Sequence, residues 1–143
     1  MELKRELVMK WTKGMLIALA VTGIALSAYL TLQSLDPHIP LNCPSTGIIN
    51  CAKVTSSPYS RLLGVPVAGL GLLWFLAVLA LGLGGGSLKE YLLPLWVMGA
   101  VFVGYLIFSE IFLIHAICVY CTATHICALV LVLPVAKLSA EPE

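Results

Sequence analysis

The sequence predicts an all-α integral membrane protein, a four-transmembrane-helix bundle with an extracytoplasmic loop and a short lid helix between spans one and two. Of the 143 residues, 60% are hydrophobic and only 10% are charged, whereas soluble domains carry about 25% charged residues. The apolar residues gather in four stretches, each near the roughly 20 residues that cross a bilayer. Short polar connections separate these stretches, so we expect one membrane domain over residues 1–143.

The four expected spans follow from where charged and loop-forming residues stop. We place them at about 14–32, 65–83, 91–113 and 117–135, with an outer loop at 35–64. The first span has no charge and follows a basic segment, and the outer loop is rich in Pro, Ser and Asn. A glycine cluster at 82–86 predicts a tight connection between spans two and three. Short connections of this kind produce antiparallel neighbours.

The basic residues predict the orientation of the bundle. With the N-terminus inside, six basic residues are cytoplasmic: Lys4, Arg5, Lys10, Lys13, Lys89 and Lys137. Only Lys53 and Arg61 then lie outside. Because cytoplasmic loops are enriched in Lys and Arg, we expect both termini in the cytoplasm and the loop 35–64 on the extracytoplasmic side.

The end of the outer loop carries signals for a short helix. Ser57 is a favoured N-cap residue, Pro58 suits the first helical position, and Gly64 suits the end. We expect a helix over 59–63 that covers the outer end of the bundle as a lid. Ser57 then either caps this helix or donates a hydrogen bond to a ligand.

A CxxC pair, Cys118 and Cys121, stands where the fourth span leaves the outer surface. Residues three apart on a helix share a face. The positive end of a helix dipole lowers the pKa of a thiol there, and the thiolate is the attacking species in thiol–disulfide exchange. The pattern predicts a redox-active pair. The competing interpretation is that these cysteines are small packing residues.

A second pair, Cys43 and Cys51, lies in the outer loop, on the same predicted side. Pro44 and Gly47 between them make the segment prone to turns, so the two sulfurs can approach each other. Alone, this pair could be a structural disulfide. Because another cysteine pair is within plausible reach, we favour a pair that shuttles electrons.

Metal and haem are not predicted. His115, Cys118, Cys121 and His125 follow one another at spacings of three, three and four, which places them in a stripe on the fourth helix. Four ligands on one straight helix cannot surround a tetrahedral ion. Haem attachment needs a histidine directly after the CxxC, and Thr122 stands there. The net charge of +1 without a basic stripe also argues against nucleic-acid binding.

Three further residues have open roles. His125 lies one turn deeper than Cys121, where it either donates a hydrogen bond to a carbonyl held there or is satisfied by a neighbouring helix. Glu110 is costly inside the third span, and a structural hydrogen bond to a neighbouring helix is favoured over proton transfer. Cys127 is expected to be a packing residue.

Taken together, these motifs resemble the vitamin K epoxide reductase family. The matching stretches are GIALSAYL at 23–30, the segment 42–51, VTSSPY at 54–59, GVP at 64–66 with Gly69, Tyr105 and Leu106 with Glu110, and AICVYC at 116–121. They cover about 14–135. The resemblance is to the compact prokaryotic form, without a fused thioredoxin-like domain.

The resemblance implies a membrane thiol–disulfide oxidoreductase that supports disulfide bond formation. Cys118 and Cys121 would be the active-site pair, with Cys121 facing a quinone of the menaquinone, ubiquinone or vitamin K type. Cys43 and Cys51 would be the shuttle pair, with Cys43 receiving electrons from a separate thioredoxin-like carrier protein.

The resemblance also places Ser57 beside the quinone and the protein in the plasma membrane. Many relatives carry a tyrosine where this chain has His125, so a polar donor persists there. Two alternatives remain, namely reduction of vitamin K epoxide by the same cysteines and a non-enzymatic membrane protein with structural disulfides.

Overall fold

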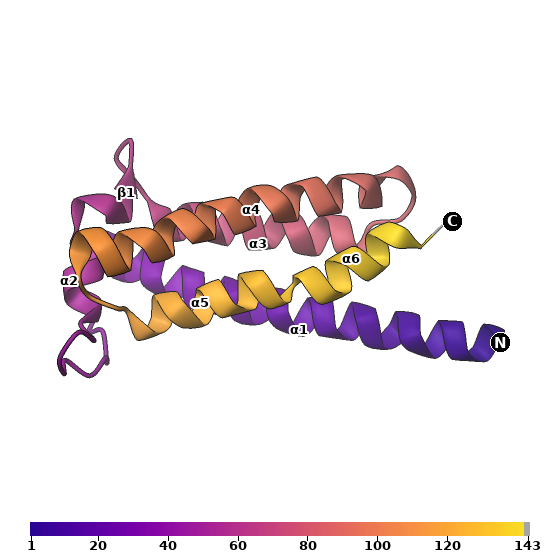
Figure 1. The fold of residues 1–143 in the computed structure, drawn as a ribbon, viewed down its shortest axis with the longest axis horizontal. Coiled ribbons are helices and arrows are strands. Elements are labelled where there is room, and N and C mark those ends of the chain that lie inside the picture. The colour runs from indigo at the N-terminus through magenta and orange to yellow at the C-terminus, as the bar shows by residue number, and fades with distance from the viewer. Residues whose placement is uncertain (142–143) are drawn as a thin grey trace.

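The computed structural model describes residues 1–141, and long helices lying side by side dominate it (Figure 1). The long helices are α1 (Glu2–Leu35), α3 (Val67–Leu83), α4 (Leu92–Phe108), α5 (Val119–Val130) and α6 (Val132–Ala140). α4 continues into a π-helical turn, Ser109–Ile114. The short elements are α2 (Cys51–Thr55), two 3-10 turns (Pro58–Ser60 and Gly86–Tyr91), β1 (Arg61–Leu62) and β2 (Val65–Pro66). Pro142 and Glu143, the end of the expected domain, lie outside the described residues.

Three helical stretches within the described part are long and apolar enough to cross a membrane. They are Glu2–Leu35, Gly86–Ile114 and Val119–Ala140. α3 is equally apolar in character but has 17 residues. The expected predominantly helical architecture, with several helices of membrane-spanning length, is therefore confirmed, whereas a fourth crossing by α3 stays a prediction.

Two helical stretches extend beyond the spans expected from hydropathy, namely α1 at both ends and the last stretch at its C-terminal end, Ala140. α1 begins at Glu2 rather than near residue 14, because the charged residues before the span are themselves good helix formers. The last stretch begins at Val119, and it is interrupted at Leu131 between α5 and α6. Pro134 explains the interruption, since proline has no N–H to donate to the carbonyl four residues earlier and its ring clashes with that carbonyl.

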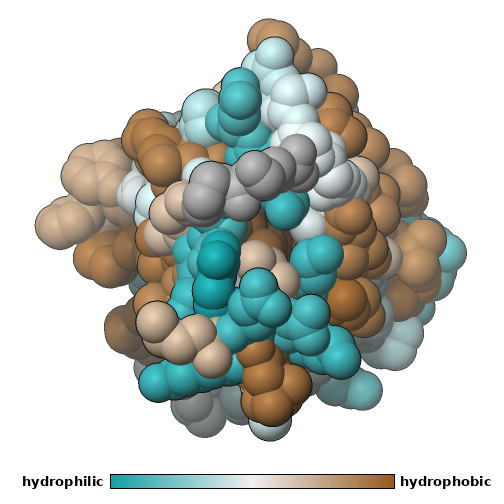
Figure 2. Space-filling view, turned by 90° about the vertical axis from the view of Figure 1, so that its right-hand side faces the viewer, coloured by the Kyte–Doolittle hydropathy of each residue, from teal (hydrophilic) through white to brown (hydrophobic). Residues whose placement is uncertain are grey.

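Both described ends of the chain meet at one end of the bundle. Arg5 and Glu141 form an ion pair with an N–O distance of 3.2 Å. Hydrophilic groups gather on this end face, with apolar side chains around them (Figure 2). The turn Gly86–Tyr91 lies at the same end, while α2 and β1, which carry Lys53 and Arg61, lie at the other (Figure 1). The two groups of basic residues used for orientation thus belong to opposite ends of the bundle.

The expected lid helix over 59–63 is not found. The segment instead forms the 3-10 turn Pro58–Ser60 and a hairpin in which Arg61 pairs with Pro66 and Leu62 with Val65. The reason is the two-residue turn between the strands, where Leu63 and Gly64 have φ angles of 53° and 86°. Two successive positive φ angles close a tight hairpin, and glycine adopts one at little cost.

Ser57 does not cap this segment with its side chain. Its hydroxyl donates a hydrogen bond back to the carbonyl of Val54, at 2.8 Å. The bond ties the start of the 3-10 turn to the end of α2.

Close packing of α1 against α3 depends on Gly23. A Cβ atom added there would lie 2.3 Å from Cε1 of Phe75, a ring that is 1% exposed. We expect Gly23→Ala to lower the free energy of unfolding by about 1–3 kcal/mol, the range for overpacked cores. Thermal unfolding in detergent, followed by circular dichroism, measures the effect.

Gly14→Ala is the matched control for this prediction, since nothing lies within 4 Å of a Cβ atom at Gly14. Alanine should raise stability there by up to about 1 kcal/mol through helix propensity. A Gly23→Ala protein as stable as the Gly14→Ala protein would contradict the assigned packing.

Candidate active site

Cys118 is the N-cap residue of α5, and Cys121 lies in the first turn of that helix. The backbone N–H of Cys121 donates to the sulfur of Cys118 at 3.3 Å. The predicted stripe of four residues on one helix is wrong, because His115 lies in the preceding link with φ 58°. Because Cys118 is the N-cap residue, the backbone N–H of Cys121 in the first turn of α5 points toward its sulfur. This arrangement stabilises a thiolate.

Hydrogen bonding sets the acidity of Cys118, which precedes the candidate span Val119–Ala140. The side chain of Cys121 donates a hydrogen bond that lowers the pKa of the Cys118 thiol below its ordinary value, and the Cys121 backbone N–H adds to this effect. Burial acts in the opposite direction but does not outweigh them. The Cys118 thiol thus ionises more readily than an ordinary cysteine thiol, which favours the thiolate that reacts in thiol–disulfide exchange.

Cys43 and Cys51 form a disulfide, with their Cα atoms 6.1 Å apart. Cys51 is the first residue of α2, and Asn50 caps this helix by accepting a hydrogen bond from the backbone N–H of Lys53 at 3.0 Å. Cys51 is buried, whereas Cys43 is partly exposed. The expected approach of these two sulfurs is confirmed. By exposure, Cys43 is the outer member of the pair and Cys51 is the inner member.

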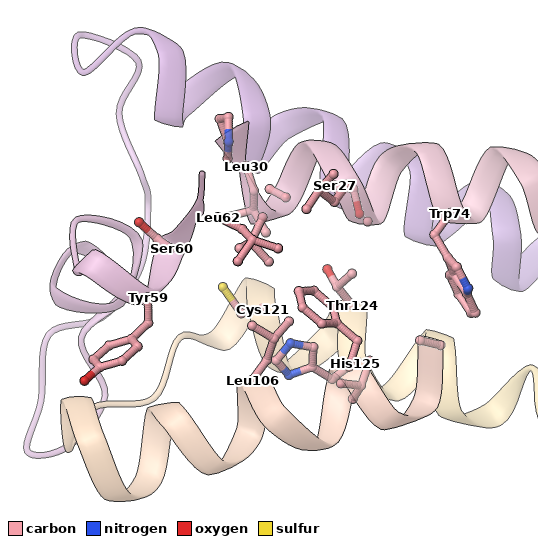
Figure 3. Close-up of a pocket in the computed structure, with 18 of the residues that line it drawn as sticks. Ser27, Leu30, Tyr59, Ser60, Leu62, Trp74, Leu106, Cys121, Thr124 and His125 are labelled. Atoms are coloured by element: carbon pink, nitrogen blue, oxygen red, sulfur yellow. The ribbon is translucent and has the colours of Figure 1, made fainter. Parts of the chain in front are cut away.

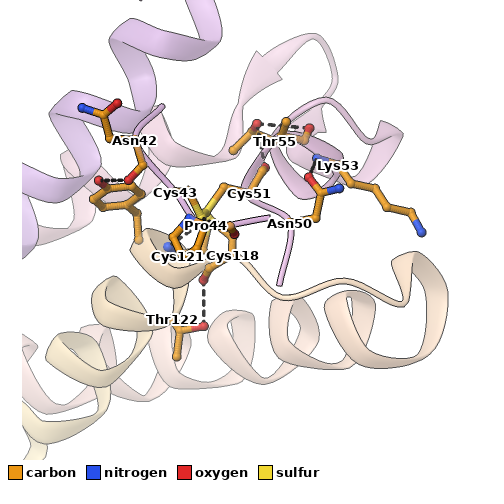
Figure 4. The surroundings of a disulfide bond; sticks show 12 residues. Asn42, Cys43, Pro44, Asn50, Cys51, Lys53, Thr55, Cys118, Cys121 and Thr122 are labelled. Carbon is orange, nitrogen blue, oxygen red and sulfur yellow. Dashed lines mark hydrogen bonds between the residues drawn. A yellow bond between two sulfur atoms is a disulfide. The ribbon is translucent and has the colours of Figure 1, made fainter. Parts of the chain in front are cut away.

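Backbone hydrogen bonds attach the outer loop to the segment before Cys118. The N–H of Asn50 donates to the carbonyl of Ile117 at 3.0 Å, and the N–H of Ile117 donates to the carbonyl of Ile48 at 2.8 Å. These bonds place Cys51 in one buried cluster with Cys118, against which Cys43 and Cys121 pack (Figure 4). The two cysteine pairs, about 70 positions apart in sequence, therefore meet at one end of the bundle.

Two tyrosines, whose role the sequence reasoning missed, hold the loop beside the CxxC. The hydroxyl of Tyr120 donates to the carbonyl of Asn42 at 2.7 Å, next to Cys43. Tyr29 on α1 donates to the carbonyl of Pro40, and its ring meets that of Tyr120 at a centroid distance of 5.4 Å. Tyr120 stands between the two cysteines of the CxxC, which is the signal that could have identified it.

An apolar cavity of about 470 Å³ opens beside the cysteines (Figure 3). Its walls come from α1, α3, α4, α5 and the segment from α2 to β2. Of the predicted site residues, Cys121, Ser57 and His125 line the cavity, while Cys43, Cys51 and Cys118 are not among its lining residues. The volume is in the range of small-molecule sites, and Cys121 is the one member of the two cysteine pairs that lines it.

Glu110 and His125 lie together in the wall of this cavity, 6% and 7% exposed. One oxygen of Glu110, Oε2, accepts from the backbone N–H of Cys118 at 3.5 Å. The other, Oε1, lies 3.9 Å from Nδ1 of His125. Glu110 makes the expected structural bond to the neighbouring chain segment, and it also faces the histidine. The π-helical turn Ser109–Ile114, which sequence reasoning did not anticipate, carries Glu110 here.

Cys127 packs into the apolar core with residues of α1, α3 and α6, as expected for a packing residue. Within residues 1–141, no three or more His, Cys, Asp and Glu side chains are grouped so that they could hold a metal ion. The functional groups that line the cavity are one thiol, a carboxyl, an imidazole and hydroxyls.

A family model described as the vitamin K epoxide reductase family matches residues 15–136 of this chain. The matched region includes both cysteine pairs and the residues of the cavity wall.

Proposed function

Because this chain belongs to the vitamin K epoxide reductase family, whose members are membrane oxidoreductases that generally use quinones, we propose that it is a quinone-dependent thiol–disulfide oxidoreductase. It would oxidise a thioredoxin-like carrier protein and pass two electrons to a quinone. The observation that carries the proposal is the ordering of the thiols. A partly exposed cysteine, Cys43, leads through buried Cys51 and Cys118 to Cys121 at an apolar cavity.

The proposed path consists of thiol–disulfide exchanges followed by reduction of the quinone. A carrier dithiol attacks Cys43, which opens the Cys43–Cys51 disulfide and leaves the carrier oxidised. The Cys51 thiolate then attacks Cys118 of a Cys118–Cys121 disulfide, which forms a Cys51–Cys118 disulfide and releases Cys121 as a thiol. Cys43 next attacks Cys51, which re-forms the Cys43–Cys51 disulfide and releases Cys118 as a thiol. The reduced CxxC pair gives two electrons and two protons to the quinone and returns to the disulfide. In sum, a carrier dithiol and a quinone become a carrier disulfide and a quinol. The direction of this reaction follows from the reduction potentials of the carrier and the quinone.

Ser57 and His125 are the proposed hydrogen-bond partners of the quinone. Both line the cavity. His125 can donate a hydrogen bond to a carbonyl oxygen, and Ser57 can do so when its hydroxyl turns from the Val54 carbonyl toward the cavity. The remaining wall is mostly apolar, which suits a hydrophobic ring and its tail. We infer a quinone of the menaquinone, ubiquinone or vitamin K type.

We also propose four membrane crossings, with α3 as the second. The end that carries both described ends of the chain and six basic residues would face the cytoplasm. The cysteines would then lie on the extracytoplasmic side of the plasma membrane, the compartment in which disulfides persist.

The test is anaerobic quinone reduction by the purified protein in detergent, with a small dithiol as electron donor. We expect reduction by the wild-type protein and by Cys127→Ala, and a rate at background in Cys121→Ala. Soluble menaquinone and ubiquinone analogues and vitamin K epoxide are offered in parallel.

Two outcomes would replace the proposal. Turnover of the epoxide in preference to every quinone would assign true vitamin K epoxide reduction. A folded wild-type protein that reduces none of these compounds, and whose disulfide resists exchange, would leave a membrane protein with structural disulfides.

A further inference from the structure

Reduction of a quinone in the apolar cavity needs a source of protons. A quinone takes up two protons with its two electrons, and the mostly apolar walls offer few groups that can supply them. Among the described residues that line the cavity, the titratable side chains are those of Tyr59, Glu110, Cys121 and His125. No lysine, arginine or aspartate belongs to that lining. Tyr59 is 36% exposed and its ring points away from the cavity centre (Figure 3).

Glu110 and His125 are the two inner titratable groups beside Cys121. They come from neighbouring segments, the π-helical turn after α4 and the second turn of α5. Both are more than nine-tenths buried, and an ionisable group at membrane depth is expensive unless it is paired or functional. Their nearest atoms, Oε1 and Nδ1, are 3.9 Å apart, so a small rotation of either side chain brings them within hydrogen-bond distance.

Glu110 also contacts the redox pair through its second oxygen. The backbone N–H of Cys118 donates to Oε2 at 3.5 Å. The carboxyl group therefore lies between the CxxC, where protons are released, and an imidazole in the cavity wall, where a proton is needed. A carboxylate that accepts from one nitrogen of a histidine also selects the tautomer of the other nitrogen.

We propose that Glu110 and His125 form a carboxylate–imidazole pair that relays one proton from the active-site thiols to the quinone. The inference rests on the proposed function and adds a role for Glu110. In this role Glu110 is a positioning and proton-holding residue, and His125 is the group that touches the quinone oxygen.

The relay balances the reaction. The S–H bonds of Cys118 and Cys121 break, the S–S bond forms, and the electron pair passes to the quinone. One thiol proton goes to the quinone directly, and the other goes to the Glu110–His125 pair. The pair holds one proton before the step, gives it from His125 to the second quinone oxygen, and regains one from the thiol, so it ends unchanged.

The test compares Glu110→Gln and His125→Gln with the wild-type protein. Glutamine at residue 110 keeps an oxygen that can accept the hydrogen bond from the Cys118 backbone N–H, but its amide cannot hold the transferred proton. Glutamine at residue 125 keeps an N–H group that can donate a hydrogen bond to the quinone, but its amide does not titrate. Glu90→Gln is the matched control, because Glu90 is exposed in the turn at the opposite end of the bundle.

Two rates are measured for each protein. The first is quinone reduction with a small dithiol, analysed as kcat and KM for the quinone. The second is reduction of the protein's own disulfides by the dithiol without quinone, followed by thiol labelling. We expect Glu110→Gln and His125→Gln to lower kcat by roughly 10²-fold, the lower end for general acid–base catalysis. For Glu110→Gln, KM and the disulfide-reduction rate should stay at wild-type values, and Glu90→Gln should match wild type throughout.

Wild-type kcat in Glu110→Gln would overturn the relay. An equal fall of both rates in Glu110→Gln would also overturn it, because that result assigns Glu110 a structural role at Cys118. A wild-type protein without any quinone reduction would instead refute the proposed function, and it is recognised by equal background rates in all four proteins.

Discussion

A Cys43→Ala protein will reduce quinone at nearly the wild-type rate when a small dithiol supplies the electrons, but at the background rate when a thioredoxin-like protein supplies them. Cys51 and Cys118 are 2% and 0% exposed, so a folded carrier cannot reach either sulfur. Cys43 is partly exposed in the outer loop. A small dithiol can bypass the loop through the cavity, where Cys121 is accessible.

The expected loss with the protein donor is roughly 10³-fold or more, the scale for removal of an essential nucleophile. Turnover is followed anaerobically through the absorbance of the quinone, with both donors offered to the same preparation. Cys127→Ala is the control, because it removes a free thiol from the core. Equal loss with both donors would refute the shuttle assignment, and full activity with both would show that the carrier attacks elsewhere.

The double variant Cys43→Ala/Cys121→Ala will form a disulfide between Cys51 and Cys118. In this protein neither remaining sulfur has its usual partner, so exchange stops at the mixed disulfide that the proposed path passes through. The two residues share a buried cluster, and the backbone bonds between Asn50, Ile48 and Ile117 hold their segments together. We expect nearly complete formation after mild oxidation, detected by peptide mapping with mass spectrometry.

The complementary variant Cys51→Ala/Cys118→Ala is the matched control, since it leaves Cys43 and Cys121. These two should pair only to a small extent, because one belongs to the outer loop and the other faces the cavity. Efficient Cys43–Cys121 pairing with little Cys51–Cys118 product would reverse the proposed order of transfer.

Much of the architecture could be read from local signals. Apolar stretches near the length of a bilayer identify the helices, since composition alone decides whether a segment is stable in lipid. The pairing of Cys43 with Cys51 follows from a short, turn-prone loop. The packing role of Cys127 and the family itself were also predictable, the latter from motifs spread over most of the chain.

The errors lie where local signals compete. Ser57, Pro58 and Gly64 suit the ends of a helix, but Gly64 also suits a tight hairpin, and the chain forms the hairpin. The stripe containing His115 failed because periodicity does not reveal where α5 begins. A helix start at Val119 makes Cys118 an N-cap residue and leaves His115 in a left-handed link.

The sequence by itself determined where the long apolar helices lie, which cysteines can pair and to which family the chain belongs, because each depends on composition, short spacing or motif identity. Only the tertiary structure decided that the two cysteine pairs meet, that Cys121 rather than Cys118 lines the cavity, and that Glu110 faces His125. These relations depend on contacts between segments far apart in the chain. The bridge from Ile49 to Ile117 and the π-helical turn that carries Glu110 create them, and neither leaves a periodic signal in the sequence.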